Sequence, residues 1–179
     1  MYYWEFETRG NMEIEFTSLK RVQAFWNALD EVAKERKYLL FTEGPDIEGT
    51  KSFIEGILKD DWTQFFVVED DKVIGWCDIV ASKREGIGHV GHLGMGVVES
   101  ARRRGIGERL LRKSIEDAFF KEIERVELDV FSSNLGAIGL YKKVGFTEEG
   151  RKRKARYIDG IYEDIIVMGL LKEEWSHAT

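Results

Sequence analysis

Residues 93–111 join a strand pattern, a basic glycine turn and a helix pattern without interruption. The segment from Leu93 to Val98 is small and apolar with no helical spacing, which is typical of a buried strand. After the turn, apolar residues recur at the spacing of one helix face, at Ile106, Leu110, Leu111, Ile115, Ala118 and Phe119. A strand that turns sharply into a helix aims unpaired backbone N–H groups at one point, and the helix dipole adds positive charge there. The stretch therefore predicts a phosphate site, and the arginines at 102–104 strengthen it.

The residues of the turn exclude two common kinds of phosphate site. A dinucleotide fold needs Gly-x-Gly-x-x-Gly, and Leu110 stands where its third glycine would be. A nucleotide P-loop needs Gly-Lys-Ser or Gly-Lys-Thr, and neither follows the turn. The turn instead resembles the Arg/Gln-x-x-Gly-x-Gly/Ala signature of the GNAT family of N-acetyltransferases, with Arg102, Gly105 and Gly107 at its fixed positions. For this motif alone, a tight turn with a solvated arginine face is the alternative.

A second motif lies downstream at the spacing that the same family shows. The family's pattern Asn-x-x-Ala-x-x-x-Tyr-x-x-x-Gly-Phe is matched in order by Asn134, Ala137, Tyr141, Gly145 and Phe146. Two motifs in the right order and at the right distance are far more specific than either alone. On both together the chain is identified as a member of the GNAT family.

The order of elements predicts an α/β fold that fits this resemblance. Ser18 is expected to cap the first helix. Helices alternate with a largely antiparallel series of strands, which indicates a three-layer α/β/α sandwich with a mixed, mostly antiparallel sheet, the acyl-CoA N-acyltransferase fold. We expect one domain over residues 1–179, with an N-terminal arm at 1–11 and a flexible tail at 173–179. Strands are expected at 12–16, 63–68, 73–80, 90–98, 126–130, from 145, and at 161–171, and helices near 22–33, 47–58, 104–121 and 134–144.

The resemblance implies acetyl-CoA as cosubstrate and assigns residues to it. No metal is expected, because His89 and His92 are three residues apart, on opposite faces of a strand. The pantetheine arm would pair with backbone groups of Met95, Gly96 and Val97 as an added strand. Contacts with the second motif would come from Asn134 and Ala137. The pyrophosphate would be held by the turn, through Arg102, Arg103, Arg104, Gly105, Ile106, Gly107 and Glu108.

Acetyl transfer to an amine has three chemical requirements that suggest catalytic residues. The nucleophile must be neutral, although a free alkylamine has a pKa near about 10.4. Negative charge on the carbonyl oxygen must be stabilised, for which a backbone N–H near Val97 is suited. The departing thiolate needs a proton, which we expect Tyr141 to supply as general acid. Asp129, in an otherwise apolar strand, is the candidate general base, and a solvated or substrate-orienting carboxylate is its alternative.

Charge and cysteine content narrow the function classes. A formal net charge of -6 argues against nucleic-acid binding, which relies on a basic field. Cys77 is the single cysteine, so an intramolecular disulfide is excluded and a reducing compartment fits. With no apolar run of membrane-spanning length and no signal-peptide pattern, we expect a cytoplasmic protein without a membrane partner. The basic run at 151–156 is interpreted as a solvated strand edge, or as a region that attracts CoA phosphates or an acidic substrate.

The sequence leaves the acceptor open. We expect a primary amine of a small molecule, an amino acid or polyamine-like, with a protein N-terminus as the alternative. A non-catalytic acyl-CoA sensor and a nucleic-acid-associated module are further alternatives, and family habit suggests a homodimer. Acceptor specificity is expected from residues 38–45, residues 83–89 and the last hairpin.

Overall fold

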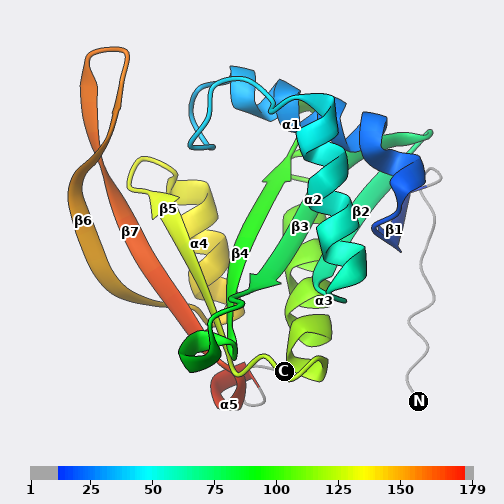
Figure 1. Ribbon diagram of the computed structural model, residues 1–179. Coiled ribbons are helices and arrows are strands. Elements are labelled where there is room, and N and C mark those ends of the chain that lie inside the picture. Colours follow the sequence, from blue (N-terminus) through cyan, green and yellow to red (C-terminus); the bar gives the residue numbers. More distant parts are fainter. Residues whose placement is uncertain (1–11, 176–179) are drawn as a thin grey trace.

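The computed structural model describes residues 12–175, so the arm predicted at residues 1–11 lies outside the described residues. These residues form a seven-stranded sheet in the order β1-β2-β3-β4-β5-β7-β6 (Figure 1). Neighbouring strands are antiparallel except β4 and β5, which are parallel. The strands are β1 Met12–Phe16, β2 Thr63–Glu69, β3 Lys72–Ala81, β4 Val90–Val97, β5 Arg125–Phe131, β6 Thr147–Ile158 and β7 Ile161–Leu171.

Helices cover both faces of this sheet. Phe25 of α1 packs against Phe66 and Trp76, which are register partners on β2 and β3. On the other face, Thr63 of β2 donates a hydrogen bond to Asp117 of α3 over 2.7 Å. The expected α/β/α sandwich with a mixed sheet is therefore confirmed. The helices are α1 Val22–Lys34, α2 Ile47–Lys59, α3 Ile106–Phe120, α4 Leu135–Val144 and α5 Lys172–Trp175, with short 3₁₀ turns η1 Leu19–Arg21, η2 Glu85–Ile87 and η3 Glu99–Ala101.

Two tight turns set the register of the β2–β3 and β6–β7 hairpins. Asp70 and Asp71 have φ of 50° and 61°, and Asp159 and Gly160 have φ of 51° and 80°. Positive φ at both central residues is the geometry whose twist matches that of the flanking strands. The hairpins predicted at these positions are formed, and the second projects away from the helices as a long twisted ribbon (Figure 1).

The predicted cap of the first helix was wrong. Ser18 precedes η1 and makes no side-chain capping bond, and Arg21 occupies the N-cap of α1. A 3₁₀ turn intervenes because the Arg21 amide bonds back to the Ser18 carbonyl over 3.0 Å. In the predicted tail, residues 173–175 belong to α5, where the Trp175 ring contacts that of Phe119.

Candidate active site

A gap in the sheet forms the site. Strands β4 and β5 pair only at residues 90–92 and 125–127, at the start of each strand. Beyond these pairs the two strands diverge (Figure 1). A cavity of about 1220 Å³ fills the gap, lined by Gly94 to Val97 on one side and by Asp129 to Phe131 on the other. The edge of β4 beyond residue 92 has no strand partner on this side, so its backbone groups are open to a ligand that extends like a strand.

The predicted phosphate turn lies at one end of this cavity. Gly105 is left-handed, with φ of 76°, and serves as the N-cap of α3. The Arg109 amide donates to the Gly105 carbonyl over 3.2 Å, so the amides of the preceding helical turn have no carbonyl of their own helix to bond. Gly105, Ile106, Gly107 and Glu108 all line the cavity. The positive end of a fifteen-residue helix thus opens into it, as a pyrophosphate requires.

The arginines of the turn do different things. Arg102 donates from Nε to the Val97 carbonyl over 2.8 Å, pairs through both other nitrogens with Glu35, and stacks on Tyr38. Arg104 pairs with Glu69. Arg102 and Arg103 line the cavity, whereas Arg104 is absent from its lining. The turn's fit to an anion therefore rests on backbone N–H groups more than on three converging guanidinium groups.

Tyr141 is held on α4 at the wall of the cavity. Its side chain is buried and its ring packs 5.7 Å from that of Phe146, centroid to centroid. Burial raises the pKa of the Tyr141 hydroxyl, and the nearby Cys77 thiol raises it further. The hydroxyl therefore keeps its proton at neutral pH, as a proton donor must.

Asn134 and Ala137 also lie on the cavity wall, where they begin α4. The Asn134 side-chain oxygen accepts a hydrogen bond from the Ala137 amide over 3.2 Å. This bond caps the helix, so the Asn-x-x-Ala spacing of the motif has a structural role in orienting the helix that carries Tyr141.

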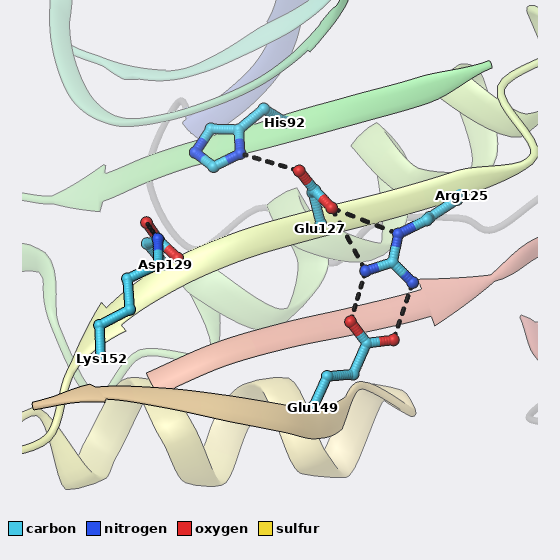
Figure 2. A network of polar contacts seen from close by, with 6 residues as sticks. All are labelled: His92, Arg125, Glu127, Asp129, Glu149 and Lys152. Carbon is cyan, nitrogen blue, oxygen red and sulfur yellow. Dashed lines mark hydrogen bonds and ion pairs between the residues drawn. The ribbon is translucent and has the colours of Figure 1, made fainter. Parts of the chain in front are cut away.

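Asp129 lines the cavity, and its carboxylate forms an ion pair with a lysine that lies outside the cavity lining. Lys152 of β6 donates to the Asp129 carboxylate over 2.7 Å. Figure 2 shows this pair beside a chain of contacts that holds the closed end of the gap. There Arg125 pairs with Glu127 and Glu149, and Glu127 lies 3.9 Å from His92.

The basic run at 151–156 is more than a solvated edge. Arg151 pairs with Asp164, Lys152 with Asp129, and Arg156 with Glu163. Arg156 is almost buried and lies over the ring of Phe131, 4.2 Å from its centroid. These pairs attach β6 to β7 and β5, the strands that bound one side of the cavity.

Asp78 is a cavity residue that the sequence analysis missed. It lies on β3 opposite Gly94 of β4 and opposite fully buried Gln64 of β2. Burial raises the pKa of its carboxyl to about 7, and the neighbouring Gln64 amide lowers it in part. The signal available in the sequence was a carboxylate within the apolar run from Val73 to Val80.

The segment between α1 and α2, which was expected to contribute to acceptor specificity, borders the cavity. Tyr38, Leu39, Leu40 and Phe41 line the cavity there, together with Phe53 of α2. The segment at 83–89, expected to contribute, is absent from the lining, and Lys83 instead pairs with Asp60 over 2.6 Å. It lies at the closed end of the gap because it connects the end of β3 to the start of β4. The last hairpin contributes Ile165 of β7.

The described part of the chain contains no helix long and apolar enough to cross a membrane. Within residues 12–175 there is also no group of three or more His, Cys, Asp or Glu side chains suited to hold a metal ion.

Comparison with known proteins defines the class. The family model described as the acetyltransferase (GNAT) family matches residues 26–146. An uncharacterized N-acetyltransferase, YokL, from a prophage of Bacillus subtilis is 27% identical over 97% of this chain and 96% of its own. The L-amino acid N-acetyltransferase AaaT of Escherichia coli is 35% identical over 58% of this chain and 64% of its own, a little under two thirds.

Solved structures agree with the sequence matches. A GNAT family acetyltransferase from Streptococcus pneumoniae superposes with a TM-score of 0.84 and 27% identity, over 90% of this chain and 99% of that one. The chain therefore belongs to the acetyltransferase (GNAT) family, and it is an acetyl-CoA-dependent N-acetyltransferase.

Proposed function

We propose that the protein acetylates the primary amine of a small molecule, an amino acid or polyamine-like compound, by direct attack of the amine on the acetyl thioester. The observation that carries this proposal is that an anion-binding turn, an open strand edge and a buried tyrosine all line one cavity. The relative AaaT, named for acting on L-amino acids, supports a small acceptor.

The residues of the cavity fit acetyl-CoA, whose thioester supplies the activated acetyl group. The amides at the start of α3 hold the pyrophosphate, because they point into the cavity without acceptors of their own helix. The unpaired edge of Met95 and Gly96 holds the pantetheine amides, as a neighbouring strand would. The Arg102 guanidinium fixes the end of this edge by holding the Val97 carbonyl.

Tyr141 delivers a proton to the departing thiolate in this proposal. Its raised pKa keeps the hydroxyl protonated, and no other described residue accepts that proton in a hydrogen bond. The role of Asp129 as base stays a prediction. Its ion pair with Lys152 supports the alternative role, that of a carboxylate that orients the acceptor.

The test is release of free thiol from acetyl-CoA, with amino acids, polyamines, aminoglycosides and peptides as acceptors. We expect turnover on one class of small amines and a loss of about 10²–10⁴-fold in Tyr141→Phe at neutral pH. Tyr157→Phe, at an exposed position on the β6–β7 hairpin, is the matched control and should keep full activity.

Three outcomes would overturn parts of the proposal. Full turnover by Tyr141→Phe would remove the tyrosine from the mechanism. Turnover on peptide N-termini alone would establish the alternative acceptor. Tight binding of acetyl-CoA with no release on any amine would favour a sensor. The predicted absence of nucleic-acid and membrane partners, the homodimer and the cytoplasmic location stay predictions.

A further inference from the structure

Asp78 of β3 has no role in the function proposed above. It is half-buried on β3 and lines the cavity beside the open edge of β4. A Cβ added at Gly94 would lie 2.9 Å from Asp78 Oδ2. The carboxyl group therefore lies against the backbone of β4, next to Met95, where the glycine leaves room for it.

Asp78 lies on the face of the sheet that α1 covers, where the segment between α1 and α2 lines the cavity and where we expect the acceptor to bind. Its neighbour Trp76, two residues away along β3, packs against α1 on this face. Val80 and its register partner His92 share the face, and His92 pairs in turn with Glu127 of β5. Two residues further along β5, Asp129 shares it too. Tyr141 comes from α4 beside α3, on the opposite face.

Strands β3, β4 and β5 carry three carboxylates on this face, and Asp78 is the one without a cation. Glu127 pairs with Arg125, and Asp129 pairs with Lys152. Among the described residues, no Lys, Arg or His nitrogen forms an ion pair with Asp78. Its pKa, raised by burial to about 7, matches that of a base that works near neutral pH.

We propose that Asp78 is the general base, which takes the proton from the acceptor's ammonium group on one face of the gap while Tyr141 protonates the leaving thiolate from the other. This assignment rests on the proposed function. It places the base beside the attacking amine and the acid beside the departing sulfur, on different sides of the thioester.

The protons and electron pairs balance. The ammonium gives one proton to the Asp78 carboxylate, which leaves a neutral amine with a free lone pair. That pair forms the C–N bond, the C–S bond breaks, and the sulfur takes the Tyr141 proton. The new amide nitrogen sheds its extra proton, which restores Tyr141. Asp78 then releases its proton to solvent, so the net products are the N-acetylated amine, free CoA thiol and one proton.

The other ionisable groups near Asp78 determine whether a change in the pH profile can be assigned to it. From β2 the facing residue is Gln64, which is neutral, and from β4 the ionisable one is His92. Glu35 at the end of α1 is paired with Arg102, and Tyr38 lies beneath that arginine. Cys77 is next in the chain but faces α3, and burial raises its thiol pKa.

The experiment compares Asp78→Asn with Asp129→Asn and His92→Gln, with the wild-type protein and the best amine from the acceptor screen. For the wild type, we expect kcat/KM to fall below about pH 7. Asp78→Asn should lose about 10²–10⁴-fold at pH 7 and regain activity as the pH approaches the pKa of the amine, since only neutral amine can then react. Asp129→Asn and His92→Gln should keep the wild-type fall below pH 7. Asp78→Glu should restore part of the rate.

Each other result has a definite meaning. An Asp78→Asn profile parallel to that of the wild type overturns the proposal, as does loss of the acidic limb in Asp129→Asn or His92→Gln alone. Unchanged binding of acetyl-CoA by Asp78→Asn shows that the variant is folded. If the wild type turns over no amine, the proposed function itself has failed, which is a different outcome from an active wild type with a dispensable Asp78.

Discussion

At the residue scale, we expect the buried Asp78 carboxyl group to lower the free energy of unfolding when it is ionised. Burial raises the Asp78 pKa from 3.8 to about 7, so between these values the folded state binds more protons than the unfolded state. The free energy of unfolding must then fall as the pH rises through this range, and the loss is complete above it. Each pKa unit corresponds to about 1.4 kcal/mol, which sets an upper bound of about 4 kcal/mol.

We therefore expect Asp78→Asn to be more stable than the wild type at pH 8, by about 1–4 kcal/mol, and the two to converge near pH 4. Asparagine keeps the shape of the side chain but does not ionise. Urea unfolding at several pH values measures the difference. Two curves that stay parallel from pH 4 to 8 would show that the carboxyl is not strained by burial.

At the element scale, helix α2 offers a matched pair of substitutions away from the cavity lining. The Asp46 side chain caps it by accepting from the Gly49 amide over 2.6 Å, and an added Cβ at Gly56 would meet nothing within 4 Å. Asp46→Ala should lower the free energy of unfolding by about 1 kcal/mol. Gly56→Ala should raise it by about 0.5–1 kcal/mol. Denaturant melts measure both, and a destabilised Gly56→Ala would mean that the helix is constrained there by something other than backbone entropy.

Elements also show what the sequence could predict. The turn after β4 and the start of α4 were predictable because strand, glycine and capping signals are local, and both border the cavity. The partner of Arg102 was not, because Glu35 is distant in sequence and meets it only when α1 packs on β4. Asp78 was missed for the same reason. A carboxylate within a strand gives no functional signal in the sequence. Its place beside a cavity follows only from the fold, in which β4 diverges from β5.

At the scale of the whole molecule, the sheet is continuous at one end of the β4–β5 gap and open at the other. Three residue pairs close one end, supported by the contacts of Arg125 with Glu127 and Glu149 (Figure 2). The open end lacks strand hydrogen bonds across the gap. A ligand that adds to the edge of β4 and binds the start of α3 therefore supplies hydrogen bonds at the open end that the sheet itself lacks.

We expect acetyl-CoA to raise the thermal midpoint by about 5–10 °C at a hundredfold excess over its Kd, since such binding adds about 2.7 kcal/mol.

Amide hydrogen exchange in the presence of acetyl-CoA should slow most in residues 93–97 and 105–109, which border the open end, and least in β1. Tyr141→Phe should show the same protection, because the hydroxyl is assigned to proton transfer and the binding contacts are backbone groups. Protection spread evenly over the sheet, or confined to the β6–β7 hairpin, would place the cosubstrate somewhere other than the gap.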